Sequence, residues 1–105
     1  MIPQDLQKEL DALIKNYARD LPGEIRLIEN LWEHFLKSNH SDDLKKVHLK
    51  LHTLAGSAPS FGFKKVGDGA RWLEGQLGNC LEKGISLTEK EQQTITQGIK
   101  DLAVI

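Results

Sequence analysis

Residues 44–61, LKKVHLKLHTLAGSAPSF, carry the clearest helical pattern in the chain and decide the fold. Apolar side chains recur there at alternating spacings of three and four, which predicts one buried helix face made of Leu44, Val47, Leu51, Leu54, Ala58 and Phe61. Pro59 cannot donate a backbone hydrogen bond, so we expect this helix to loosen at the proline and to end by Gly62.

Two helices are expected before this segment. The first follows Pro3 and should end before the turn at RDLPGE (19–24), with an apolar stripe of Leu6, Leu10, Leu13 and Tyr17 that we interpret as core. The second should begin near Pro22 and bury Ile25, Ile28, Trp32 and Phe35. The polar linker SNHSDD (38–43) follows, and Ser41 in it is a candidate N-cap for the next helix.

Two further helices are expected after Gly62. One should end near Gly84 and bury Val66, Ala70, Leu73, Leu77 and Cys80. The last opens with a capping box of Thr88 and Glu91 and should bury Ile95, Ile99 and Leu102. Since no segment shows sustained strand alternation, the sequence predicts an all-α fold: an antiparallel four-helix bundle with an additional short N-terminal helix.

Length and composition narrow the class of protein. The 105 residues suffice for one modest core, so we expect a single domain over residues 1–105 and a monomer. A formal net charge of −1 and the lack of an aromatic-interleaved basic stripe argue against nucleic-acid binding. No apolar run or signal segment suggests a membrane, and we expect a cytoplasmic protein. Cys80, the single cysteine, excludes an internal disulfide and is expected in the core.

His52 is the candidate reactive residue. At about 100° per residue, it lies roughly 130° from the centre of the buried face, and Leu49 and Gly56 lie nearly opposite that face. The small residues Ala55 and Gly56 one turn later leave the ring uncovered for a partner. An exposed histidine is largely neutral near pH 7 and keeps a lone pair that can accept a phosphoryl group. No carboxylate on the same helix is placed to orient it as a general base.

The segment His52 to Gly62, HTLAGSAPSFG, resembles the signature of the histidine-containing phosphotransfer (HPt) domain, broadly H-x-x-K-G-x-x-x-x-x-G. His52, Gly56 and Gly62 match it, and the following FGFxxV and ARWLE resemble the family's next helix. The resemblance covers about residues 21–102. It implies that His52 takes a phosphoryl group from a receiver domain or a sensor or hybrid histidine kinase and passes it to another receiver, the response regulator.

The resemblance also implies what the chain leaves to its partners. HPt domains carry the phosphoryl group without independent catalysis, so we expect no enzyme activity and no cofactor, with the Mg²⁺ on the partner receiver domain. One position departs from the family pattern. Family members frequently have a lysine three residues after the histidine, and this chain has Ala55 there. We interpret this as a change in the phosphate environment, and positive charge is available at Lys45, Lys50, Lys64 and Lys65.

The expected docking face surrounds His52. It consists of exposed apolar and small residues at Leu49, Gly56 and Pro59, with Lys45 and His48 at the rim. Two other functions stay open from the sequence. One is a helical adaptor that binds a receiver or kinase without carrying phosphate. The other is a metal-binding bundle, because His48 and His52 are spaced to share one helix face, although a third ligand would have to come from another helix.

Overall fold

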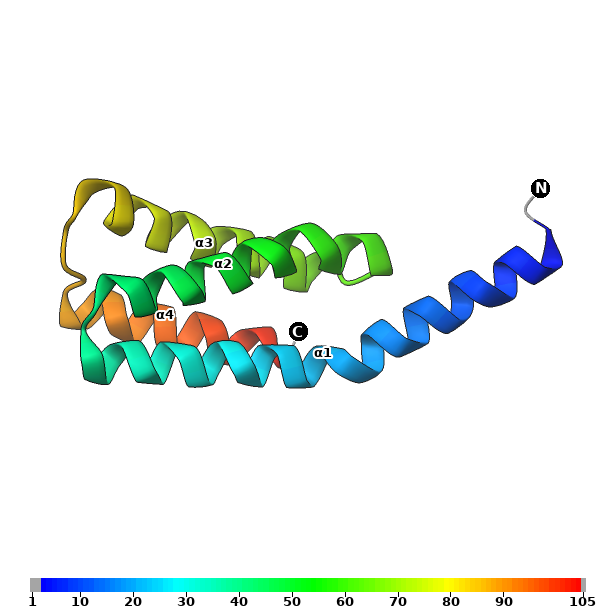
Figure 1. The fold of residues 1–105 in the computed structure, drawn as a ribbon, viewed down its shortest axis with the longest axis horizontal. Coiled ribbons are helices and arrows are strands. Elements are labelled where there is room, and N and C mark those ends of the chain that lie inside the picture. The colour runs from blue at the N-terminus through cyan, green and yellow to red at the C-terminus, as the bar shows by residue number, and fades with distance from the viewer. Residues whose placement is uncertain (1–2, 105) are drawn as a thin grey trace.

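The computed structural model describes residues 3–104, which form four α-helices and one short 3₁₀ helix, with no strand among them. The elements are α1 (Gln4–Ser38), α2 (Ser41–Ser57), η1 (Ala58–Phe61), α3 (Lys64–Lys83) and α4 (Glu89–Leu102). The helices run alternately up and down in a bundle, and the described chain measures 52 × 22 × 21 Å (Figure 1). The predicted all-α antiparallel four-helix bundle is confirmed.

The core lies between the four helices and contains the side chains that the spacing pattern places inside. α2 and η1 bury Leu44, Val47, Leu51, Leu54 and Ala58, whereas Phe61 is half-buried. The other helices contribute Leu21, Ile25, Ile28, Trp32, Phe35, Val66, Ala70, Leu73, Leu77, Ile95, Ile99 and Leu102. Cys80 is half-buried against this core, and burial raises the pKa of its thiol, as does the nearby charge of Glu91.

The first two predicted helices are one continuous helix, so the prediction of a separate short N-terminal helix was wrong. Pro22 lies inside α1 and cannot donate to the carbonyl of Ala18. The helix continues because Leu21, Ile25 and Ile28, on both sides of the missing bond, bury their side chains in the core. The free energy of that packing outweighs one lost backbone hydrogen bond.

The N-terminal half of α1 leaves the bundle, as the blue end of the ribbon in Figure 1 shows. Its predicted core stripe was therefore wrong at three of four positions, since Leu6, Leu10 and Leu13 are exposed. Only Tyr17 packs as expected: its ring stacks on Phe61 at 4.3 Å between centroids.

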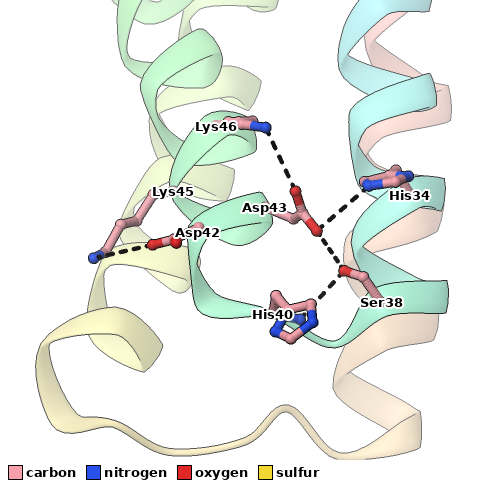
Figure 2. A network of polar contacts seen from close by, with 7 residues as sticks. All are labelled: His34, Ser38, His40, Asp42, Asp43, Lys45 and Lys46. Carbon is pink, nitrogen blue, oxygen red and sulfur yellow. Dashed lines mark hydrogen bonds and ion pairs between the residues drawn. The ribbon is translucent and has the colours of Figure 1, made fainter.

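The corner between α1 and α2 is held by polar side chains instead of the predicted Ser41 cap (Figure 2). His40 occupies the N-cap position, and no side chain caps α2 there. Ser38 connects the two helices, because its hydroxyl accepts from the backbone N–H of His40 at 3.2 Å and donates to Asp43 at 2.5 Å. Asp43 also lies 3.5 Å from His34 and 3.6 Å from Lys46.

This corner should make stability depend on pH. The Ser38 hydrogen bond holds the pKa of Asp43 below its usual value, against the opposing effect of desolvation, and the charges of His34 and Lys46 act in the same direction as the hydrogen bond. A lowered pKa in the folded state gives stability that is present above the pKa of the unfolded chain and is lost as pH falls through the folded value. Asp43→Asn should therefore lower Tm at pH 7, with a difference from wild type that shrinks toward pH 3.

Thermal melts between pH 7 and pH 3 would check this prediction. Asp42→Asn is the matched control, because Asp42 lies on the same helical turn but is exposed, and within residues 3–104 its one ion pair is with Lys45, at 3.8 Å. A difference between wild type and Asp43→Asn that stays constant over this pH range would contradict the linkage.

The remaining helix ends follow the predictions. α2 ends at Ser57, and Pro59 lies in η1, which ends before Gly62. Gly62 has a φ of 92°, a left-handed conformation that glycine adopts without strain. α3 ends at Lys83, and the following Gly84 has the same left-handed conformation, with φ 65°. The predicted capping box is present, since Thr88 Oγ1 accepts from Glu91 N at 3.1 Å and Thr88 N donates to the Glu91 carboxylate at 3.0 Å. Across the described helices, none is long and apolar enough to cross a membrane.

Candidate functional site

His52 lies on the outer side of α2, with its side chain 67% exposed. Leu49, one turn earlier on the same side, is 63% exposed, and Gly56, one turn later, is exposed as well. These positions agree with the predicted directions of all three residues. The imidazole is therefore held on a rigid helix and is accessible to another molecule.

A carboxylate from α3 holds the His52 ring. Glu74 Oε1 lies 2.5 Å from His52 Nδ1. A carboxylate accepts hydrogen bonds, so Nδ1 carries the hydrogen in this pair, and in the neutral ring Nε2 keeps the lone pair. The contact thus fixes both the tautomer and the orientation of the imidazole, and it leaves Nε2 as the nitrogen available for reaction.

Two glycines of α3 fix the alignment of α2 and η1 against this helix. A Cβ at Gly67 would lie 2.7 Å from Pro59 Cδ, and a Cβ at Gly78 would lie 3.2 Å from His48 Nε2. Pro59 and His48 therefore pack closely over glycines on one face of α3, before and after the pair of His52 and Glu74. The contacts Pro59–Gly67, His52–Glu74 and His48–Gly78 belong to one antiparallel register. Moving from one contact to the next goes back along η1 and α2 by as many residues as it goes forward along α3.

Two other glycines, Gly56 one turn after His52 and Gly75 next to Glu74, have no such packing role. A Cβ at Gly56 of α2 or at Gly75 of α3 would meet no atom within 4 Å, and both residues are exposed. Mid-helix glycine costs about 1 kcal/mol relative to alanine. No contact within the bundle offsets that cost, but the absence of side chains at Gly56 and Gly75 leaves both positions open to solvent.

Because Gly67 is closely packed and Gly56 is not, replacing each with alanine should change the stability of the protein in opposite directions. Gly56→Ala should stabilise the protein by about 0.5–1 kcal/mol and raise Tm by a few degrees, because the new Cβ meets open space and improves helix propensity. Gly67→Ala should lower Tm, because the Pro59 ring must shift. Thermal or denaturant unfolding of the two variants checks the prediction, which fails if both changes stabilise equally.

The other predicted site residues are placed as follows. Lys45 reaches back to Asp42 at 3.8 Å, and Lys50 pairs with Glu24 of α1 at 4.0 Å, so neither ammonium group is directed at His52 by these contacts. His48 is half-buried on Gly78, whereas Pro59 is exposed on η1. Ala55 is buried in the core and contributes no charge to the surface around the ring.

The described residues bring no metal-ligand cluster together. Within residues 3–104, no group of three His, Cys, Asp or Glu side chains could hold a metal ion. His48 packs on α3 while Nδ1 of His52 is engaged by Glu74.

Comparison with known protein families shows which family the chain belongs to. The family model of the Hpt domain matches residues 4–104, nearly the whole sequence, and the protein therefore belongs to the Hpt domain family. Members of this family are phosphocarrier modules of histidine phosphotransfer. Comparison with curated proteins and with solved structures gives no match.

Sequence reasoning missed one residue of the site, Glu74. It lies in the ARWLE segment, but no role follows from its position in the sequence alone. The only available signal was indirect: Glu74 is next to the core residue Leu73 and one turn from Ala70 and Leu77, so it borders the buried face of its helix. Its contact with His52 depends on the register of α2 and α3, which the spacing pattern does not specify.

Proposed function

We propose that this protein is a histidine phosphotransfer protein of a multistep phosphorelay, with His52 as the phosphoryl acceptor. The observation that carries the proposal is the exposed His52 ring with Nδ1 bound to Glu74, beside a surface kept free of side chains at Gly56 and Gly75. In this role it takes a phosphoryl group from a sensor or hybrid kinase or its receiver domain and passes it to a response regulator. Membership of the Hpt family supports this role.

The geometry fits a simple transfer step. The Nε2 lone pair of His52 attacks the phosphorus of an aspartyl phosphate on the receiver, the P–O bond to that aspartate breaks, and the aspartate leaves as a carboxylate. Since Nδ1 keeps its hydrogen, the phosphorylated ring carries positive charge, and the Glu74 carboxylate 2.5 Å away stabilises it. Transfer to a second receiver reverses these bond changes. The Mg²⁺ that assists the step is expected on the receiver.

The proposed docking face is the exposed surface of Leu49, Gly56 and Pro59 next to His52, with Lys45 and His48 at its rim. Leu49 is 63% exposed and contributes little to the core, so Leu49→Asp should leave helicity and Tm nearly unchanged. It should weaken transfer about tenfold or more, because it places a charge in an apolar contact. Circular dichroism and transfer rates check this prediction, which a loss of helicity would contradict.

A transfer assay with intact-mass analysis tests the proposed function. The protein is incubated with phosphorylated receiver domains and active hybrid kinases of the same cell, and its mass is measured at neutral and acid pH. Wild type should gain one acid-labile phosphoryl group and His52→Gln none. His40→Gln is the matched control, since His40 is also exposed but lies at the α1–α2 corner; it should be phosphorylated like wild type.

The transfer assay and a thermal melt separate the alternatives. If folded wild type binds a receiver or kinase but gains no phosphoryl group from the whole panel, the phosphate-independent adaptor replaces the relay. If zinc raises the Tm of wild type but not of a His48→Gln variant, the metal-binding bundle is favoured. Gly56→Ala adds an internal check, because the proposal expects this more stable variant to accept the phosphoryl group more slowly.

A further inference from the structure

Phosphorylation of His52 would place a second negatively charged group near the Glu74 carboxylate. A phosphoryl group brings close to two negative charges, and Nε2 and Nδ1 belong to one ring, so the group would lie near the Glu74 carboxylate that binds Nδ1. Repulsion between these two groups opposes the attraction between the Glu74 carboxylate and the positively charged ring, and a cation near the phosphoryl group would relieve that repulsion. This step rests on the proposed function.

Most basic residues near the site are engaged or distant. Lys45 pairs with Asp42, and Lys50 pairs with Glu24. Lys64 and Lys65 lie at the start of α3, about 15 Å along the helix axis from Glu74 at 1.5 Å per residue. His48, one turn before His52, packs on Gly78.

Arg71 is the remaining cation, and the helix register places it at the site. It lies one turn before Glu74 on α3, between Gly67 and Gly78, whose contacts define the face toward α2. Equal antiparallel steps from His52 and Glu74 put Arg71 at the level of Ala55, about 4.5 Å along α2 from His52. Ala55 has no side-chain atom beyond its methyl group, so that position places no longer side chain between Arg71 and His52, and an arginine side chain spans that distance.

The Arg71 side chain is also free to act. Arg71 is exposed, and among the described residues no carboxylate forms an ion pair with it within 4.0 Å, although Asp68 and Glu74 lie one turn to either side. A guanidinium presents a planar set of donors that matches phosphoryl oxygens.

We propose that Arg71 contacts the phosphoryl group on Nε2 of His52 and offsets its repulsion by Glu74. Arg71 thereby stabilises the phosphorylated protein and shifts the equilibrium of transfer toward His52. Glu74 holds the nucleophilic ring and Arg71 holds the transferred group, so adjacent turns of α3 serve the two states of the same histidine.

The test compares wild type with Arg71→Gln and Arg71→Lys. Each protein is phosphorylated by a phosphorylated receiver, and the equilibrium partition of phosphate between the two proteins is measured. The phosphoprotein is then separated from the receiver, and the phosphoryl group is titrated by ³¹P NMR. Arg26→Gln is the matched control: it removes an exposed arginine from α1, beside Leu102 at the end of α4 and the following Ala103.

Arg71→Gln should shift the partition away from His52 by about three- to tenfold and raise the pKa of the phosphoryl group, because a nearby cation favours the dianion. Arg71→Lys should restore part of both effects, and Arg26→Gln should match wild type. The titratable side chains on the adjoining turns of α2 and α3, His48, Asp68 and Glu74, are unchanged in all variants.

Three results overturn the proposal. Equal partition and equal ³¹P titration in wild type and Arg71→Gln exclude a role for Arg71. Slower transfer with an unchanged ³¹P titration assigns Arg71 to receiver docking instead. Absence of any phosphoryl group on wild type overturns the proposed function and this inference with it, a result distinct from the other two.

Discussion

Replacing Glu74 with alanine should slow phosphoryl transfer to His52 by about 10- to 100-fold, a range taken from the loss of hydrogen-bond partners that orient metal-binding histidines. The side chain accepts from Nδ1 at 2.5 Å, so its loss frees the ring to rotate and to place its hydrogen on Nε2. It also removes the charge that stabilises the phosphorylated ring. Initial rates with a phosphorylated receiver, quenched before equilibrium, measure this effect.

A second variant separates the two contributions of Glu74. Glu74→Gln keeps a carbonyl oxygen that can accept from Nδ1 but removes the negative charge, so its rate should fall between wild type and Glu74→Ala. Glu82→Ala, an exposed glutamate two turns later on α3, is the matched control and should transfer at the wild-type rate. The ¹⁵N chemical shifts of the His52 ring report the tautomer directly. A wild-type rate in Glu74→Ala, with an unchanged tautomer, would exclude the positioning role.

The interior of this bundle was predictable residue by residue, because apolar residues at helical spacing lie on one helix face, and that face packs into the core. Leu51, Leu73 and Ile99 are predicted on inward faces and are almost completely buried. The direction of His52 follows from the same geometry, since a residue far from the buried face of a surface helix must point outward.

Features that depend on more than one helix were not predictable in this way. A proline inside a helical pattern predicts a break, but at Pro22 the packing on both sides outweighs the lost hydrogen bond, so α1 continues. The spacing of the apolar residues around Leu10 predicts a core face, yet these residues are exposed. Periodicity shows that a helix face is apolar, but not that another helix covers it. The contact between His52 and Glu74 requires the register of α2 against α3.

Replacing Trp32 with alanine should have the largest effect on stability, a loss of about 3–5 kcal/mol. The side chain is 2% exposed, packs against Phe35 at 5.4 Å between ring centroids, and donates from Nε1 to Thr96 Oγ1 at 2.8 Å. Its removal therefore leaves a cavity between α1 and α4 and breaks their polar connection. Since a domain of this size has a total stability of about 5–15 kcal/mol, Tm should fall by more than about 10 °C.

The second tryptophan gives the matched control for this prediction. Trp72 is 50% exposed on α3, so Trp72→Ala should cost less than about 1 kcal/mol. Each variant leaves one tryptophan as a fluorescent reporter, and the emission of Trp32 in Trp72→Ala should lie at shorter wavelength than that of Trp72 in folded Trp32→Ala. Denaturant unfolding followed by circular dichroism measures both stabilities. Similar losses in the two variants would mean that α1 and α4 are not held together by the buried indole.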